Sequence, residues 1–282
     1  MYGWLAFSIF AASLYSILLH GYPAKKKGSI YELNFFASIV WVVILFFFNH
    51  CKIYLNIEIL LWGIAYGITQ ALFVMFKAKA MNSGPVSVTT LIGNASLLVS
   101  VIVSSIVWDE KIGLLDLCGV ILLLIGLFLS AYEKHTVSGD KFWKYYVCIF
   151  FLLAALVGII FKGFGKSSVS GHTGDMLLIS AAVMALFYFL VLLATHSWSI
   201  PIAKRKFFAY GLAAGVLSCL YNWVNITLSA VMDAVIFFPA FNGGVIVASG
   251  VLSGLLFKEK FSKRKLCGFA LALAAIIIIG VC

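Results

Sequence analysis

Long apolar runs, separated by short polar stretches, occupy almost the whole chain. A helix that crosses a bilayer needs about 20 mostly apolar residues, and about 17 can suffice. These runs do not alternate polar with apolar positions, so they predict membrane-spanning helices and not strands. Ten segments follow from this pattern, the last of them short: 2–20, 30–49, 57–79, 84–107, 114–132, 143–161, 175–195, 207–229, 232–256 and 266–281.

The second half of the chain repeats the first. The tripeptide Leu-Cys-Gly occurs at 117–119 and again at 266–268, and the pair Glu-Lys occurs at 110–111 and 259–260, at the same offset. Each half holds five segments, and the longest polar stretch, 133–141, separates the two sets. Because five is odd, the second copy must enter the membrane in the opposite sense.

The predicted fold is therefore an all-α membrane protein with ten transmembrane helices, arranged as two inverted five-helix repeats. The first repeat covers residues 1–135 and the second covers residues 136–282. We expect the two repeats to form a single integrated membrane domain.

The charged residues predict the orientation of these segments. The chain is 63% hydrophobic and only 11% charged, whereas a soluble domain carries roughly a quarter charged residues. Sixteen Lys and Arg lie in or beside the loops that follow the odd-numbered segments, and four lie on the side of the termini: Lys52, Lys111, Lys162 and Lys166. By the positive-inside rule, we expect a multi-pass protein of the cell membrane with both termini outside the cytoplasm.

The same residues argue against several classes of function. The net charge of +10 could suit nucleic acid, but the cations lie in short loops, where lipid headgroups are the nearer partner. The six cysteines are scattered without metal-type spacing, so we expect no metal and no cofactor. We find no HExxH, no paired Asp motif and no convergent set of histidines, and we therefore expect no catalytic residues.

The acidic residues all fall in loops or at helix ends. Intramembrane carboxylates are the usual sites of ion coupling and of cation binding. Their absence from the helix centres argues against the exchange of protons for cationic drugs, and it favours a neutral or zwitterionic solute.

Uncharged polar residues concentrate in segments three, four, eight and nine. On segment eight, Ser218, Asn222, Asn225 and Ser229 share one helix face. We expect the four polar segments to line a cavity, with segments five and ten at the periphery. The predicted substrate-binding residues are Gln70, Thr90, Asn94, Asn222 and Asn242 as hydrogen-bonding groups, with Tyr15 and Tyr221 as aromatic walls. For any single Asn, the alternative is a bond between neighbouring helices, which contributes about 0.6 kcal/mol on average.

Two positions predict an interrupted helix. Pro239 has no N–H to donate to the carbonyl of Val235, and Gly243 follows in a run of flexible residues. Gly93 occupies the centre of the matching segment in the first half. Irregular backbone inside a membrane is tolerated only against protein or a wet cavity, so we predict a helix break or hinge at these three residues. The alternative is a static packing kink.

The chain resembles the ten-helix EamA-type family of the drug/metabolite transporter superfamily. The five-plus-five repeat carries the resemblance, together with the acidic-basic loops at 108–111 and 257–260, each of which leads into a glycine-containing last helix. The resemblance implies a central cavity between the first four helices of each half, and transport of amino acids, other metabolites, sugars, choline-like solutes or drugs. The chain departs from the family in two respects. Ten-helix members commonly have cytoplasmic termini, whereas the loop charges here predict the reverse. The chain also lacks the membrane-embedded glutamate of the four-helix multidrug relatives.

We therefore expect a secondary transporter that moves a small polar organic solute, an amino acid or a similar neutral or zwitterionic metabolite, by alternating access. Its expected partners are the solute and membrane lipid. The sequence is compatible with a monomer and with a homodimer. One alternative is a flippase for lipid-linked sugars on the same fold. Others are an integral-membrane enzyme that modifies lipids and a passive channel, although no ring of like charges or filter signature occurs.

Overall fold

The computed structural model describes residues 1–21, 29–131, 140–196, 205–257 and 262–281. These residues form helices connected by short loops, without strands, as the sequence predicts. The helices are α1 (Tyr2–Gly21), α2 (Ser29–Phe48), α3 (Ile57–Ser83), α4 (Val86–Ala95), α5 (Leu97–Trp108), α6 (Leu114–Ala131), α7 (Trp143–Gly165), the 3-10 turn η1 (Ser170–His172), α8 (Thr173–Ala194), α9 (Arg205–Val231), α10 (Ala234–Phe257) and α11 (Lys263–Val281).

Each of the ten predicted segments coincides with helix. In the described part of the chain, seven helical stretches are long and apolar enough to cross a membrane, and α1 and α6 supply shorter apolar stretches. Segment four consists of two helices, α4 and α5, which meet at Ser96, three residues after Gly93, where the sequence predicts a break. The protein is thus a multi-pass membrane protein.

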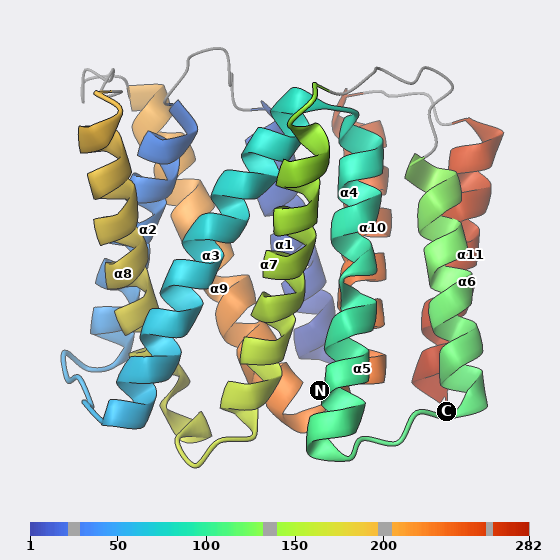
Figure 1. Ribbon diagram of the computed structural model, residues 1–282, viewed down its shortest axis with the longest axis horizontal. Coiled ribbons are helices and arrows are strands. Elements are labelled where there is room, and N and C mark those ends of the chain that lie inside the picture. Colours follow the sequence, from blue (N-terminus) through green and yellow to red (C-terminus); the bar gives the residue numbers. More distant parts are fainter. Residues whose placement is uncertain (22–28, 132–139, 197–204, 258–261, 282) are drawn as a thin grey trace.

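The helices run up and down between two faces, and both ends of the chain lie at the same face (Figure 1). The two halves begin with α1 and α7, and these two helices run in opposite directions between the faces (Figure 1). The start of α7 is tied to the end of α3, because the backbone N–H of Asp140 donates to the carbonyl of Ser83 at 2.8 Å.

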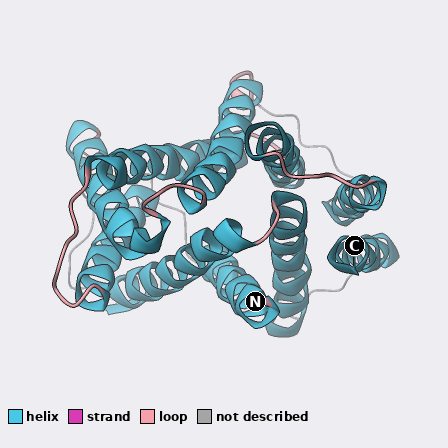
Figure 2. Ribbon diagram, turned by 90° about the horizontal axis from the view of Figure 1, so that it is seen from below, coloured by secondary structure: helices cyan, strands magenta, loops and turns pink. Residues whose placement is uncertain are grey.

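Helices of the first half pack mainly against helices of the second half. Helix α1 packs on α9 and α10, α3 packs on α7 and α8, and α2 packs on α8 and α9. The last helices of the two halves, α6 and α11, form a pair at one end of the molecule (Figures 1 and 2). A Cβ atom added to Gly126 would lie 2.8 Å from the carbonyl oxygen of Gly268, so these two helices approach closely because both residues lack a side chain.

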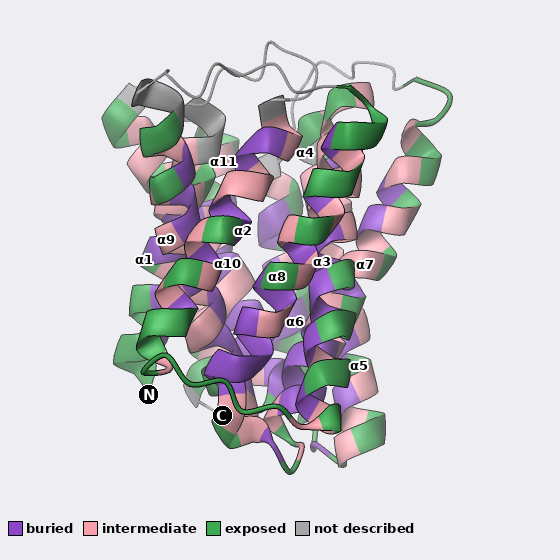
Figure 3. Ribbon diagram, turned by 90° about the vertical axis from the view of Figure 1, so that its left-hand side faces the viewer, coloured by how far each residue is buried: buried purple, intermediate pink, exposed green. Residues whose placement is uncertain are grey.

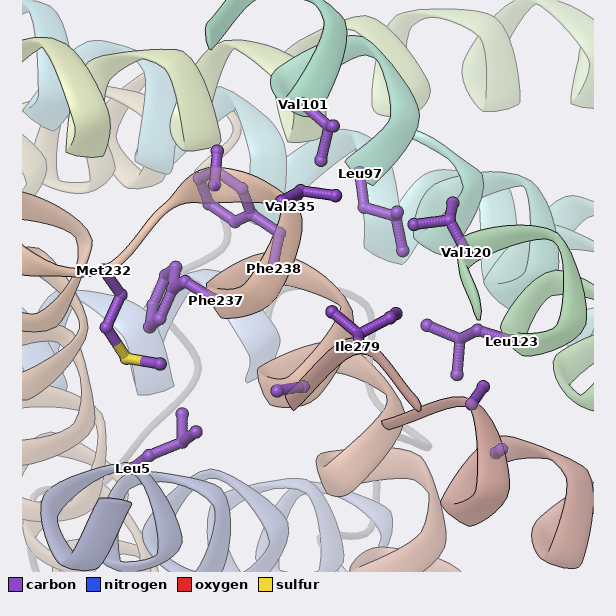
Figure 4. Close-up of a cluster of buried hydrophobic side chains, with 14 of the residues drawn as sticks. Leu5, Leu97, Val101, Val120, Leu123, Met232, Val235, Phe237, Phe238 and Ile279 are labelled. Atoms are coloured by element: carbon purple, nitrogen blue, oxygen red, sulfur yellow. The ribbon is translucent and has the colours of Figure 1, made fainter. Parts of the chain in front are cut away.

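Apolar side chains fill the spaces between helices and also cover the outside. One buried cluster joins α10 to α5, α6 and α11, and its members include Leu123, Phe237 and Ile279 (Figure 4). A second joins α2, α3, α7, α8 and α9. Exposed residues form broad bands along the outer faces of the helices (Figure 3), and many are large and apolar, such as Phe47 and Ile106. An apolar exterior is what a lipid environment requires.

Lys162 corrects one detail of the sequence analysis. The apolar pattern ends segment six at residue 161 and leaves Lys162 in a loop, but α7 continues to Gly165 and the Lys162 side chain is fully buried. Its ammonium pairs with the Glu110 carboxylate and donates to the carbonyl of Met232 at 2.7 Å. A buried charge is tolerated when it is paired and hydrogen-bonded, and these partners come from distant parts of the sequence.

Candidate functional site

The polar face of α9 is buried against its neighbours. The indole N–H of Trp41 on α2 donates to the hydroxyl of Ser218 at 2.7 Å. The hydroxyl of Tyr66 on α3 donates to the side-chain oxygen of Asn222 at 2.8 Å. Asn222 is 2% exposed and donates in turn to the carbonyl of Ser218 at 2.8 Å. The bonds from Trp41 and Tyr66 each fasten a helix of the first half to α9, whereas the bond from Asn222 to Ser218 lies within α9.

The lower part of the same face makes two more connections. The hydroxyl of Ser8 on α1 donates to the side-chain oxygen of Asn225. The hydroxyl of Ser229 donates to the carbonyl of Phe161 on α7 at 3.1 Å. The face predicted from spacing alone thus connects α9 to α1, α2, α3 and α7.

A cavity lies beside the upper end of this face, between helices of both halves. The space around its lining side chains is about 340 Å³ with adjoining open solvent included, and only a small part of that space is wide enough for a water molecule. Five helices contribute the lining residues: Tyr15 from α1; Asn34, Ala37, Ser38 and Trp41 from α2; Gln70 and Val74 from α3; Met184 and Tyr188 from α8; and Ser218 and Tyr221 from α9.

The lining is aromatic and polar but carries no charged side chain. The rings of Tyr15 and Tyr221 lie 5.8 Å apart between centroids. The hydroxyl of Tyr188 is occupied, because it donates to the carbonyl of Ala71 at 3.1 Å. Gln70 is buried and makes no side-chain hydrogen bond with any described residue. Its amide can therefore offer both a donor and an acceptor to a bound solute.

The structure brings some of the predicted site residues together and leaves others apart. Tyr15, Gln70 and Tyr221 line the cavity, and Asn222 adjoins it through its bond to Ser218. The remaining three are not among its lining residues: Thr90 and Asn94 on α4, and Asn242 on α10.

Two of these three polar side chains bond to their own helices. The Thr90 hydroxyl donates to the carbonyl of Val86 at 2.9 Å, and the Asn242 amide donates to the carbonyl of Phe238 at 2.9 Å. Their part in binding a solute stays a prediction.

The polar residues by themselves predict a lining from four polar segments together with Tyr15, whereas the cavity lies among α1, α2, α3, α8 and α9. Only the resemblance implies α2 and α8, because it places the cavity between the first four helices of each half. Asn34, Ser38 and Trp41 carry a signal that could have identified α2, because their spacing of four and three residues places them on one helix face. The strong hydropathy of α2 and α8 hides such a face. Tyr188 carries no comparable signal.

The predicted hinge residues are all closely packed. Helix α10 runs through Pro239 as one helix, and Pro239 and Gly243 are buried. A Cβ atom at Gly243 would lie 2.7 Å from Leu123, and one at Gly93 would overlap the ring of Phe150. Gly93 lies three residues before Ser96, where α4 ends. Motion at these positions stays a prediction.

No group of three or more His, Cys, Asp or Glu side chains within the described ranges is arranged to hold a metal ion. The chemistry that the cavity offers is hydrogen bonding and aromatic contact. Such a lining suits the binding of an organic solute.

Comparison with known proteins agrees with the architecture. Residues 1–132 match the EamA-like transporter family, a family of the drug/metabolite transporter superfamily. The resemblance inferred from the repeat and loop motifs is thus confirmed over this stretch. No curated protein matches the sequence. The chain is similar to a solved structure described only as a crystal structure of a protein, with 14% identity and a TM-score of 0.70, covering 98% of this chain and 95% of that chain. At this identity the likeness establishes the fold alone.

Proposed function

From the match of residues 1–132 to the EamA-like transporter family, we propose that the protein is a secondary transporter for a small polar organic solute. The solute is an amino acid or a similar neutral or zwitterionic metabolite. The observation that carries this proposal is the uncharged, aromatic and polar cavity between helices of both halves. A carrier needs such a site where its two moving units meet.

Inverted repeats supply those two units. Matching glycines of the two halves support this arrangement. A Cβ atom on Gly67 of α3 would lie 2.8 Å from the carbonyl of Ser180 on α8, and one on Gly215 of α9 would lie 2.6 Å from the Cβ of Val40 on α2. The third helix of each half thus abuts the second helix of the other, and the last helices pair with each other.

Alternating access requires the cavity to open toward each face in turn. The cavity is narrow, because only a small part of its empty space is wide enough for a water molecule. On the face that holds the termini, Lys162, Glu110 and Met232 join α7 to the loops before α6 and α10. Opening toward that face must separate these groups. Pro239, Gly243 and Gly93 are the positions where we propose that the backbone bends, and Thr90, Asn94 and Asn242 then meet the solute along its path.

The test is solute exchange by the purified protein in liposomes. We expect counterflow of at least one labelled amino acid or related metabolite. Replacement of Gln70 by Ala should lower its transport by about tenfold, because a hydrogen bond to the solute is worth roughly 1 kcal/mol or more. Thr227→Ala is the control, because Thr227 is exposed and its hydroxyl bonds only to its own helix at Trp223. Absence of flux for a broad solute panel from folded protein would contradict the proposal.

A further inference from the structure

Lys77 is a cation in the membrane-spanning part of α3. It lies six residues before the helix ends at Ser83, which is about 9 Å at the usual rise per residue. Its side chain is partly buried. A lysine at such a position is costly unless something compensates its charge, and intramembrane ionisable residues therefore tend to have a function.

The face of α3 that carries Lys77 also forms the wall of the cavity. Gln70 and Val74 line the cavity, and Lys77 follows them at spacings of four and three residues, which places all three on one face. Lys77 thus lies about one turn beyond the lining, toward the C-terminal end of α3, and that end of the helix is away from the termini (Figure 1).

No acidic side chain neutralises Lys77 among the residues that the structure describes. Its ammonium forms no ion pair or hydrogen bond there, and its one recorded partner is the ring of Phe73, at 5.8 Å from the ring centroid. Lys162 shows the opposite situation, since it has both a carboxylate and a carbonyl. The cavity adds no compensating charge of its own, because its lining carries none.

We propose that Lys77 is the specificity-determining residue for an anionic group of the solute, namely a carboxylate. This inference rests on the proposed transport function and narrows its substrate class. The carboxylate enters the cavity beside Lys77, which compensates its charge, while the Gln70 amide and the rings of Tyr15 and Tyr221 contact the rest of the solute. A charge-assisted bond of this kind is stronger than a neutral one.

The competing explanation is that Lys77 only extends its ammonium toward the membrane surface. Lys79 provides a matched comparison for it. Lys79 is on the same helix, is also partly buried, and also lies over aromatic rings, those of Phe76 at 5.4 Å and Tyr146 on α7 at 5.8 Å. Lys79 therefore faces α7 and not the cavity. If Lys77 only extended its ammonium toward the surface, its replacement should affect solute binding no more than replacement of Lys79.

The experiment measures binding with paired probes, each a free carboxylic acid and its primary amide. Leucine, phenylalanine and serine, their N-acetyl derivatives, and the amides of all six form the panel, and phosphoethanolamine tests a phosphate in place of a carboxylate. Ligand-induced shifts in melting temperature, followed by titration, give apparent affinities for the full chain in detergent. We expect acids to bind and their amides not to bind.

The variants assign the effect to Lys77. In Lys77→Gln we expect the affinity for the acids to fall about 10- to 100-fold, the usual value of a hydrogen bond to a charged group, while Lys77→Arg and Lys79→Gln keep it. Equal binding of acids and amides, preference for phosphoethanolamine, unchanged affinity in Lys77→Gln, or no binding of any acid by folded protein would overturn the inference. The proposed function survives if the liposome assay still shows flux of an uncharged solute.

Discussion

At the scale of single residues, the ion pair of Lys162 and Glu110 brings two ionisable side chains together in a buried position. Glu110 also accepts the backbone N–H of Ala234 at 2.8 Å, at the start of α10. A carboxylate at this position stabilises the positive end of the helix dipole. One pair of side chains thus joins α7, α10 and the loop before α6.

Removal of one partner should therefore destabilise the protein strongly. We expect Lys162→Met to lower the free energy of unfolding by about 3–5 kcal/mol, because Glu110 is left buried without its cation. Thermal unfolding in detergent measures the effect. Lys166→Met is the matched control, since Lys166 lies four residues further along and is exposed.

A second variant separates charge from packing. The double variant Lys162→Met/Glu110→Leu removes both charges and should recover part of the lost stability, although Ala234 then lacks its acceptor. If Lys162→Met unfolds at the same temperature as Lys166→Met, the ion pair contributes nothing measurable and this account of the terminus-side face is wrong.

At the scale of helices, glycine determines how closely α6 and α11 approach. A Cβ atom on Gly268 would lie 2.6 Å from the carbonyl oxygen of Gly126 and 2.6 Å from the backbone nitrogen of Ser130. These neighbours are backbone atoms that cannot rotate away. The pair therefore holds together by direct backbone contact, as small residues allow in membranes.

A larger side chain at Gly126 should force the two helices apart. We expect Gly126→Ile to lower the free energy of unfolding by about 1–3 kcal/mol through overpacking, measured as a decrease in melting temperature. The control is Gly280→Ile on α11, where a Cβ atom would meet nothing within 4 Å. Equal melting temperatures of the two variants would show that α6 and α11 can separate without loss of stability, which would contradict this explanation.

The bounds of most helices follow from the apolar pattern, but that pattern does not locate the break between α4 and α5. The sequence placed an interruption at Gly93, and α4 ends two residues later at Ala95. The hydroxyl of the next residue, Ser96, donates to the carbonyl of Gly93 at 2.6 Å. Pro239 had the stronger local signal, yet α10 continues through it. Pro239 removes one backbone hydrogen bond, and packing of neighbouring helices can compensate for this loss in a membrane. The local sequence does not show which helices will be neighbours.

At the scale of the whole molecule, the two faces differ in charge. The positive-inside count predicts that the face with the termini lies outside the cytoplasm. The loop between α2 and α3 lies on that face (Figure 1), and this loop contains the exposed residue Cys51. The same count places the C-terminal Cys282 outside, so the measurement uses a Cys282→Ser background. There we expect a membrane-impermeant maleimide to label Cys51 in intact cells, and Cys51→Ser should abolish this labelling.

The opposite face supplies the complementary measurement. Asp140 is exposed and precedes α7, so Asp140→Cys in a Cys51→Ser/Cys282→Ser background should react only after the membrane is permeabilised. The reverse pattern, with Asp140→Cys labelled in intact cells, would place the termini in the cytoplasm, as is common in the ten-helix family that the motifs resemble.

The sequence by itself determined the number and extent of the membrane helices, because burial in lipid acts on each segment separately and leaves a long apolar run in each one. It also determined the polar face of α9, because helical periodicity is a local property. Only the tertiary structure decided that Trp41 and Tyr188 join Gln70 around one cavity, that Lys162 is buried with Glu110, and that Lys77 lies beyond the cavity without a described counter-charge. Those relations depend on which helices become neighbours, and residues far apart in the chain carry no periodic signal of their contact.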